Sequence, residues 1–313
     1  MKAVVAVTGA NGFVGRALCQ HLQRVGHPVI PILRSARGDW PDARAVGDLG
    51  PHTDWTQALS GAEVVIHCAA RAHVPLRGDA DELEDCRQTN VEGTRSLAHA
   101  AAAHGIRRLV HVSSIKVLGE HSAFGAPLTE QSPPAPEDAY GVSKWEAEQA
   151  LASVSEATGL ETVIVRPPLV YGPGVKANFL RLMEAVRRGV PLPLASVNNL
   201  RSMVALDNLT DLLAICAVHP GAAGNTFLVS DDDDLSTPDL VRGMAAATGR
   251  SARLFPCPPS LLRLAGALTG RSDQIERLIG NLQVDIGHTQ QVLQWIPRCT
   301  VQQGLQSATQ DLQ

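Results

Sequence analysis

The sequence lacks the cysteine and histidine spacings by which many proteins bind metals. Its six cysteines are scattered, with no C-x-x-C pair, and none of its eleven histidines recurs at the helical spacing H-x-x-x-H. Paired spacings of this kind are typical of zinc sites and disulfide frameworks. We therefore expect no metal site, and the scattered thiols are typical of a protein kept reduced in the cytoplasm.

Long apolar runs and basic tracts are also missing. The most apolar late stretch, 261–268, is too short to span a bilayer and contains Arg263. An apolar run at the N-terminus could pass for a signal peptide, but Gly9 and Gly12 interrupt it, and it fits a first strand better. The formal net charge of -4 comes without a cluster of basic residues. We therefore expect a soluble protein that binds neither membrane nor nucleic acid.

Short apolar runs and helical patterns alternate regularly along the sequence. β-branched runs predict strands, and apolar residues with a period near that of a helix predict helices between them. The strands are expected at residues 4–8, 29–33, 45–46, 64–68, 109–112, 162–165 and 226–229. This alternation predicts an α/β fold with a doubly wound, Rossmann-like parallel sheet, whose ligands bind at the carboxyl ends of the strands.

One run of charge stands out, the four aspartates at 231–234. It lies between an expected strand and a helix whose start is signalled by Ser236. Four adjacent carboxylates cannot all converge on one ion without an elaborated loop. We therefore expect a solvated loop here rather than a metal site.

The strongest local pattern is a glycine-rich turn after the first strand. The glycines are spaced G-x-x-G-x-x-G and are followed by a helical pattern. The first glycine permits a tight turn, the second lets the backbone approach a pyrophosphate, and the third lets helix and strand pack closely. The free N–H groups of the helix favour a phosphate. A turn that merely tolerates glycine is the alternative. We predict a dinucleotide cradle formed by Gly9, Asn11, Gly12, Phe13, Val14 and Gly15.

The end of the second strand bears on the choice between NADP and NAD. An acidic residue at this point accepts a hydrogen bond from the ribose 2′-OH and indicates NAD. The chain has Arg34 and Ser35 instead, a cation and a hydroxyl that suit a 2′-phosphate. The sequence therefore favours NADP, with NAD possible, and a solvated Arg34 is the alternative. Other residues expected along the cofactor are Asp48, Leu49, Ala69, Ala70, Arg71, Asn90 and Pro167.

Tyr140 and Lys144 are the candidate catalytic pair. At positions i and i+4 of an expected helix they share one face, and Ser114 closes the strand at 109–112. Reduction of a carbonyl requires a proton donor for the oxygen that becomes negative. We expect the Lys144 ammonium, together with a cationic nicotinamide, to lower the pKa of Tyr140 from about 10 toward neutral pH, while Ser114 hydrogen-bonds the same oxygen. A structural tyrosine beside a surface lysine is the alternative.

Taken together, these motifs carry a family resemblance over nearly the whole chain. They resemble the extended short-chain dehydrogenase/reductases that act on nucleotide sugars. The resemblance implies a dinucleotide-binding domain at 1–171, to which segments at about 198–230 return, and a smaller substrate-binding α/β lobe at 172–313. The strings that carry it are TGANGFVG at 8–15, HCAA at 67–70, SS at 113–114, Y-x-x-x-K at 140–144 and RP at 166–167.

The resemblance also implies roles for individual residues. Ser114 matches the family's catalytic serine, and Lys144 matches a lysine that also binds the nicotinamide ribose. Asn178 and Arg201 match residues that contact the nucleotide diphosphate, and Lys116 is expected beside the substrate with Ser114. For Asn178 the alternative is a helix N-cap, and for Arg201 it is a surface position.

Within this family the reaction depends on a few positions. Ile115 and Lys116 stand where dehydratases carry an Asp-Glu pair, and Leu118 and Arg34 depart from the usual 4-epimerase pattern. The string SSIKVLGE at 113–120 is similar to 4-ketoreductases that make N-acetylated 6-deoxyhexosamines for surface polysaccharides. The sequence therefore favours an enzyme that reduces C4 of a UDP-2-acetamido-2,6-dideoxy-4-ketohexose. The alternatives are a UDP-sugar 4-epimerase with retained NAD and an idle NADP-binding regulator.

Members of this family often form homodimers through two helices packed as a four-helix bundle. The helices at 83–104 and 144–157 would take that place here. Their outer faces are not apolar enough to decide, so a homodimer is left open.

Overall fold

A seven-stranded sheet forms the centre of the protein. The computed structural model describes residues 2–35, 40–72 and 79–310. The strands lie in the order β3-β2-β1-β4-β5-β6-β9, and each neighbouring pair is parallel. This is the doubly wound α/β fold that the sequence predicts. The strands are β1 (Val5–Thr8), β2 (Val29–Leu33), β3 (Arg44–Ala45), β4 (Val64–His67), β5 (Arg108–Val112), β6 (Glu161–Arg166) and β9 (Thr226–Leu228).

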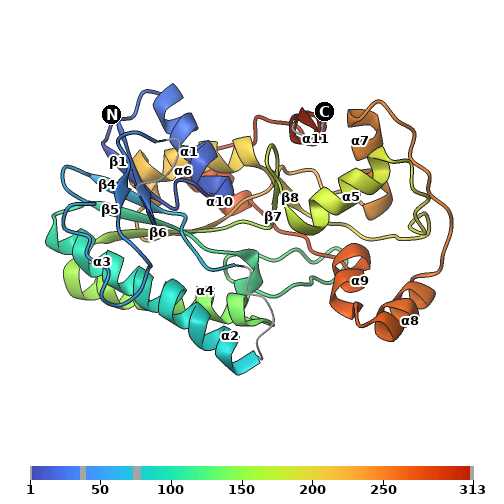
Figure 1. Ribbon diagram of the computed structural model, residues 1–313, viewed down its shortest axis with the longest axis horizontal. Helices are drawn as coiled ribbons and strands as arrows, with labels where there is room; N and C mark the ends of the chain where they lie inside the picture. Colours follow the sequence, from blue (N-terminus) through green and yellow to red (C-terminus); the bar gives the residue numbers. More distant parts are fainter. Residues whose placement is uncertain (1, 36–39, 73–78, 311–313) are drawn as a thin grey trace.

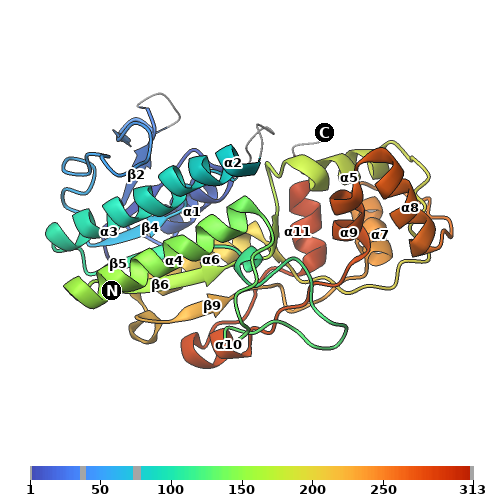
Figure 2. The ribbon, with the colours of Figure 1, turned by 90° about the horizontal axis from the view of Figure 1, so that it is seen from below.

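Helices cover both faces of this sheet, as Figure 1 and Figure 2 show. On one face α1 packs against α6, and on the other α3 packs against α4. Every residue of β1 and β4 is buried, which explains why these strands are continuous apolar runs in the sequence. The helices are α1 (Phe13–Arg24), α2 (Asp79–Cys86), α3 (Gly93–Ala103), α4 (Ala139–Thr158) and α6 (Leu206–Val218).

The helix expected at 83–104 is divided into two. Between α2 and α3 the chain forms a π-helical turn, Arg87–Glu92, in which Asn90 and Val91 are buried. A π turn widens a helix locally and often occurs at functional sites. Here it accompanies the contact of Asn90 with the loop after β4, which a helical period alone does not predict.

A second, smaller part of the molecule lies beyond one end of the sheet (Figure 2). Its core is a separate apolar cluster built around the parallel strands β7 (Leu169–Tyr171) and β8 (Met203–Ala205). The chain returns from here to the main sheet through α6 and β9, beside which α10 (Gly287–Leu293) packs. Within the described ranges, no helix is both long and apolar enough to cross a bilayer. The helices of this part are α5 (Ala177–Arg187), α7 (Thr237–Ala247), α8 (Pro259–Thr269), α9 (Ser272–Ile279) and α11 (Val301–Ala308).

The prediction that the aspartates at 231–234 form a solvated loop is wrong at Asp231. This residue is 7% exposed. Its carboxylate accepts three hydrogen bonds, from the Ala205 N–H at 2.8 Å, the Asn208 amide at 2.7 Å and the Tyr171 hydroxyl at 2.6 Å. Three donors from distant segments stabilise a buried carboxylate, and charge density along the sequence does not reveal them.

Candidate active site

The glycine-rich turn joins β1 to α1 at the carboxyl edge of the sheet. Gly9 has a φ of +67°, and a Cβ on it would lie 2.9 Å from the Ala69 backbone. A Cβ on Gly15 would lie 2.2 Å from the carbonyl oxygen of Gly9, so neither glycine is replaceable without a shift of the chain. Gly12 is the N-cap residue of α1, and no side chain caps this helix. Its first N–H groups are therefore available to a phosphate, which fits the pyrophosphate of a dinucleotide. The other predicted cradle residues, Asn11, Phe13 and Val14, lie in the same turn.

Arg34 follows β2 and forms an ion pair with Asp48 at the edge of the sheet. Both side chains are more than three-quarters exposed, and Ser35 is exposed beside them. Leu49, the next residue after Asp48, is half-buried. The structure thus places a cation and a carboxylate side by side. The cation suits a ribose 2′-phosphate, and the carboxylate suits a ribose hydroxyl.

The loop after β4 is held against the glycine turn. The Ala69 N–H donates to Thr8 Oγ1 at 3.3 Å. Asn90 Oδ1 accepts from the Arg71 N–H at 2.8 Å, and Asn90 Nδ2 donates to the Arg71 carbonyl at 3.1 Å. Asn90, predicted beside the cofactor, therefore uses its amide to shape the loop. Residue 70 in this loop is exposed.

Tyr140 and Lys144 lie on the first turns of α4, four residues apart as predicted, and Lys144 bonds to His111 rather than to Tyr140. The Tyr140 hydroxyl has no hydrogen-bond partner among the residues that the structure describes, and desolvation, helped by Asp138, raises its pKa. Lys144 is 1% exposed and donates to His111 Nε2 at 3.0 Å. Burial lowers the pKa of Lys144 to about 8. Burial penalises the phenolate and the Lys144 ammonium bonds to His111 of β5, so these residues by themselves do not lower the pKa of Tyr140. The lowering expected with a cationic nicotinamide beside them stays a prediction.

Ser114 lies directly after β5, beside the N-terminus of α4. Its hydroxyl accepts from the Lys116 N–H at 3.2 Å, and the short turn Ile115–Val117 packs against α4. Ser113, the residue before Ser114, donates to Glu148 of α4. Glu148 in turn forms a buried ion pair with Arg166 of β6, which donates to it at 3.0 and 2.6 Å. Pro167, predicted near the cofactor, is buried next to this pair along the chain.

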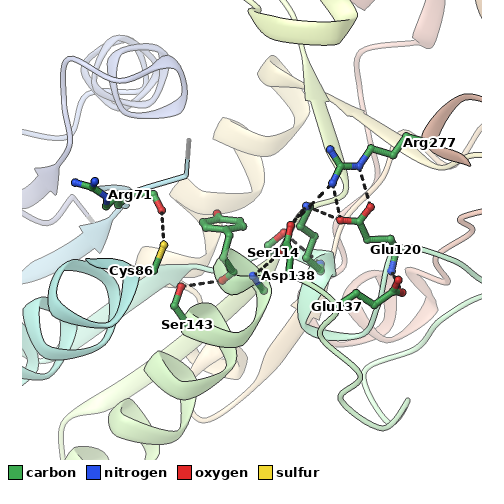
Figure 3. A network of polar contacts seen from close by, with 11 residues as sticks. Arg71, Cys86, Ser114, Glu120, Glu137, Asp138, Ser143 and Arg277 are labelled. Carbon is green, nitrogen blue, oxygen red and sulfur yellow. Dashed lines mark hydrogen bonds and ion pairs between the residues drawn. The ribbon is translucent and has the colours of Figure 1, made fainter. Parts of the chain in front are cut away.

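A charged cluster beside Ser114 joins the two parts of the molecule, and Figure 3 shows it from close by. Lys116 Nζ lies 2.6 Å from Glu120 and also pairs with Asp138. Arg277 on α9 donates twice to Glu120, at 2.8 and 2.9 Å. Burial disfavours the Glu120 carboxylate, but the hydrogen bonds from Arg277 and Lys116 outweigh it and hold its pKa at about 2.

Arg201 and Asn178, the predicted diphosphate contacts, are placed differently from each other. Arg201 is half-buried, donates to the Gly280 carbonyl at 3.1 Å, and lies close enough to Glu120 for their charges to interact. Burial lowers its pKa to about 10. The surface alternative for Arg201 is therefore wrong. Asn178 is exposed on the first turn of α5 and is not its N-cap residue, so that alternative is wrong as well.

Sequence reasoning did not single out Asp138, Glu120, Arg277 or His111. A signal for Asp138 was present, because an aspartate just before a helix is a common N-cap, and Asp138 accepts from the Gly141 N–H at 2.7 Å. Glu120 and Arg277 are 157 positions apart, so their pairing follows only from the fold. His111 lies within the strand β5, and nothing in the sequence distinguishes it from its neighbours there. Only its contact with Lys144 in the structure marks it.

A Rossmann-like sheet with a glycine turn at one strand end and a serine, tyrosine and lysine at another is the arrangement of nucleotide-dependent oxidoreductases. The model of the NAD dependent epimerase/dehydratase family matches residues 5–230 of this chain. The protein belongs to this family of NAD-dependent enzymes.

Known proteins that resemble the chain include a UDP-glucose 4-epimerase of Vibrio cholerae. It is 42% identical over 313 aligned residues, which cover 99% of this chain and 95% of the relative. Among solved structures, a UDP-glucuronic acid 4-epimerase from Bacillus cereus in complex with NAD has a TM-score of 0.77 at 21% identity, covering 97% of this chain and 94% of that one. A UDP-glucose 4-epimerase from Thermotoga maritima with UDP-glucose also has a TM-score of 0.77, at 20% identity, covering 99% and 98%. At these identities the two structures support the fold.

Proposed function

We propose that the protein is a UDP-sugar 4-epimerase, which inverts the C4 hydroxyl of a nucleotide-linked hexose through a transient 4-keto sugar. The observation that carries the proposal is the 42% identity with the UDP-glucose 4-epimerase of Vibrio cholerae over 99% of this chain. Ser114, Tyr140 and Lys144 at neighbouring strand and helix ends supply the groups that the reaction needs.

The proposed reaction assigns one task to each of these three residues. The dinucleotide, when bound, accepts and returns the hydride at C4. Tyr140 takes the proton of the C4 hydroxyl and gives it back, while Ser114 holds the same oxygen by a hydrogen bond. Lys144 binds the ribose and favours the phenolate of Tyr140 by its charge. The phenol oxygen, which has no partner among the described residues, is open to a substrate hydroxyl.

The nucleotide diphosphate is proposed to bind at a group of cationic side chains beside Ser114. Lys116, Arg201 and Arg277 gather beside Ser114, against the carboxylates Glu120 and Asp138. Arg201 uses one of its five N–H donors on Gly280 and keeps others for a phosphate. Asn178, exposed on α5, is the further diphosphate contact that the family resemblance implies.

A 4-ketoreductase is the second candidate. Lys116 and Leu118 stand next to the catalytic serine, in a string similar to reductases of UDP-2-acetamido-2,6-dideoxy-4-ketohexoses. Lys116 places a cation two residues after Ser114. This reaction consumes its reduced cofactor and agrees with the predicted NADP site at Arg34 and Ser35.

One purification and one assay separate the two candidates. The protein is purified without added cofactor, denatured, and the released nucleotide is identified by chromatography. The native protein is then incubated with UDP-glucose and with UDP-N-acetylglucosamine, and the 4-epimers are separated. An epimerase retains NAD and interconverts the sugars with no net change in absorbance at the NADH band. Tyr140→Phe, purified in parallel, controls for contaminating epimerase.

The same samples are offered a UDP-linked 4-keto sugar with NADPH or NADH. Stoichiometric consumption of NADPH, without retained NAD and without interconversion of UDP-sugars, identifies the reductase and contradicts the epimerase. Absence of both activities over the full panel contradicts both candidates.

The choice of cofactor is tested at the Arg34–Asp48 pair. If Arg34 binds a 2′-phosphate, Arg34→Ala weakens NADPH binding by about ten- to a hundred-fold, the value of a charge-assisted contact of roughly 1.5–3 kcal/mol, and leaves NADH unchanged. In that case Asp48→Asn strengthens NADPH binding. If Asp48 instead holds the ribose hydroxyl, Asp48→Asn weakens NADH. Titration of intrinsic fluorescence gives the dissociation constants, and equal affinities for both cofactors in the unmutated protein contradict the NADP prediction.

A homodimer through α3 and α4 is also proposed. A groove of about 610 Å³ runs between α2, the π turn and α4, with Val91, Trp145 and Ala150 in its lining and the Arg87–Glu146 ion pair beside them. Most of the lining is polar or charged, Val91 and Ala150 are buried, and Trp145 is the apolar side chain that the groove leaves partly exposed. Aromatic residues are enriched at protein interfaces, so the proposal centres on Trp145. Sedimentation of the protein and of Trp145→Glu is the test, and a monomer in both contradicts it.

A further inference from the structure

Lys144 is held in the structure by a partner that the reaction does not use. Its Nζ lies 3.0 Å from His111 Nε2, and the two side chains are 1% and 0% exposed. No other hydrogen bond of this ammonium is found in the part of the chain that the structure describes. The position of the lysine at the end of β5 therefore depends on an imidazole.

The chemistry of this contact fixes the state of the histidine. An ammonium has only donors, so His111 Nε2 must be the acceptor and the ring proton must be on Nδ1. Nδ1 is buried and has no hydrogen-bond partner among the described residues. A buried N–H without a partner is unfavourable, so packing alone does not explain a histidine at this strand position.

The surroundings keep this histidine neutral. Burial, with the charge of Lys144 next, lowers the pKa of His111 well below its usual value. The His67 ring lies 5.4 Å away, bonded to Thr8 Oγ1 at 2.6 Å and to Thr94 Oγ1 at 3.1 Å. A neutral imidazole tilted against another neutral imidazole can accept a hydrogen bond from a cation without repelling it.

The other titratable groups that face Lys144 do not replace His111. Glu148 on the same helix and Cys68 after β4 both raise the pKa of Lys144, while burial lowers it. Glu148 is already engaged by Arg166 at 2.6 Å and by the Ser113 hydroxyl at 2.5 Å. Cys68 is a half-buried thiol whose pKa is raised by desolvation, so it carries no charge to share. Tyr140, one turn earlier on α4, makes no contact with the ammonium.

We propose that His111 is a positioning residue, which holds Lys144 in its charged form at the active site by accepting a hydrogen bond through Nε2. The inference rests on the proposed roles of Tyr140 and Lys144. In it, β5 supplies the acceptor that keeps a buried cation charged beside Tyr140. Without it the free amine is favoured, and the phenolate loses its neighbouring charge.

The charge state of Lys144 is directly measurable because the chain has only four lysines, Lys2, Lys116, Lys144 and Lys176. Lysine labelled at the ε-carbon gives four NMR signals, and Lys144→Met identifies one of them. In the unmutated protein this signal is expected to titrate with a pKa of about 8. His111→Phe removes the acceptor, keeps a ring, and is expected to lower that pKa by about one unit or more, as loss of a charged hydrogen bond does.

Two matched variants accompany this measurement. His111→Gln presents an amide oxygen that still accepts, and is expected to restore the pKa toward its original value. His67→Gln changes the neighbouring buried ring without touching Lys144, and is expected to leave the titration unchanged. A His111→Phe protein whose Lys144 titrates as in the unmutated protein overturns the proposal.

A second measurement needs no variant that alters the core. Nitrogen-15 shifts of the histidine rings distinguish the two neutral tautomers. The proposal requires His111 to carry its proton on Nδ1 and to remain neutral at pH 6. A cationic His111, or one protonated on Nε2, overturns it even if His111→Phe does not fold.

The pH dependence of enzyme activity tests whether the contact between His111 and Lys144 matters for catalysis. The activity of His111→Phe relative to the unmutated enzyme is expected to be near one at pH 6, where Lys144 is charged in both, and to fall to about one-tenth above pH 9. A pH-independent loss indicates a structural role and contradicts the proposal. If no UDP-sugar is turned over, the proposed function fails, while the lysine and histidine titrations still decide this inference.

Discussion

The two tyrosines of this chain differ in burial and in what their hydroxyl groups contact, since Tyr171 is buried and Tyr140 is half-buried. The Tyr171 hydroxyl donates to Asp231 at 2.6 Å and is fully enclosed, with a pKa raised by burial and by that carboxylate. The Tyr140 hydroxyl has no partner within the described ranges. A phenol left without a partner at the N-terminus of a helix is available for a reacting oxygen, whereas a phenol bonded to a carboxylate is structural.

The first prediction compares these two residues. Tyr140→Phe keeps the ring and removes the proton carrier, so kcat is expected to fall by about 10²–10⁴-fold while cofactor affinity and stability stay unchanged. Tyr171→Phe is the matched control. It should retain kcat but lose about 1–3 kcal/mol of stability, because Asp231 loses a donor. Steady-state kinetics and urea unfolding measure both. Near-full activity in Tyr140→Phe would show that another group carries the proton.

At the scale of single elements, the turn between β1 and α1 is predicted to bind the dinucleotide through its backbone. The second prediction is that Gly15→Ala lowers dinucleotide affinity by at least about tenfold, because its Cβ would lie 2.2 Å from the Gly9 carbonyl and push the turn aside. Gly105→Ala is the control for an added methyl group away from the site: Gly105, unlike Gly15, has a positive φ of +69°, and its Cβ would have no atom within 4 Å. It should cost about 1–2 kcal/mol of strain and leave affinity unchanged. Fluorescence titration with NADH measures the affinity of each variant. Unchanged affinity in Gly15→Ala would contradict the prediction that this turn binds the dinucleotide.

Elements with local signals could be predicted from the sequence. The strand Val29–Leu33 has the predicted bounds, and Ser236 caps α7 as expected, accepting from the Asp239 N–H at 3.1 Å. These features depend on side-chain pattern and cap chemistry within a few residues. The π turn and the contact of Lys144 with His111 could not be predicted, because they depend on how helices meet strand ends that are distant in sequence.

The whole molecule is held together beside the candidate site by contacts between its two parts. Arg277 of α9 bonds to Glu120, and the segment after α9 pairs with the loop that follows Glu120, for example through the Leu128 N–H and the Gln283 carbonyl at 2.8 Å. Substrate bound near Ser114, as proposed, would lie where the two parts meet. The ion pair between Arg277 and Glu120 would then affect both substrate binding and the stability of the folded protein.

The last prediction concerns acid stability. Glu120 is 13% exposed, and hydrogen bonds from Arg277 and Lys116 hold its pKa at about 2, below the value of about 4.3 in an unfolded chain. A lowered folded pKa means that the stabilisation is present above pH 4.3 and is lost as the pH falls toward 2. Glu120→Gln should therefore cost about 1.5–3 kcal/mol at pH 7 and progressively less at pH 4 and 3, measured by urea unfolding.

Glu276→Gln serves as the control, since Glu276 pairs with Arg263 in a more exposed ion pair, 35% and 55% accessible. It should cost less than about 1 kcal/mol. A Glu120→Gln defect that stays constant from pH 7 to 3 contradicts the assigned linkage. A loss of stability in Glu120→Gln that shrinks as the pH falls supports the linkage. If the variant also has a raised KM for the UDP-sugar at pH 7, Glu120 both joins the two parts and orients the cations that bind the substrate.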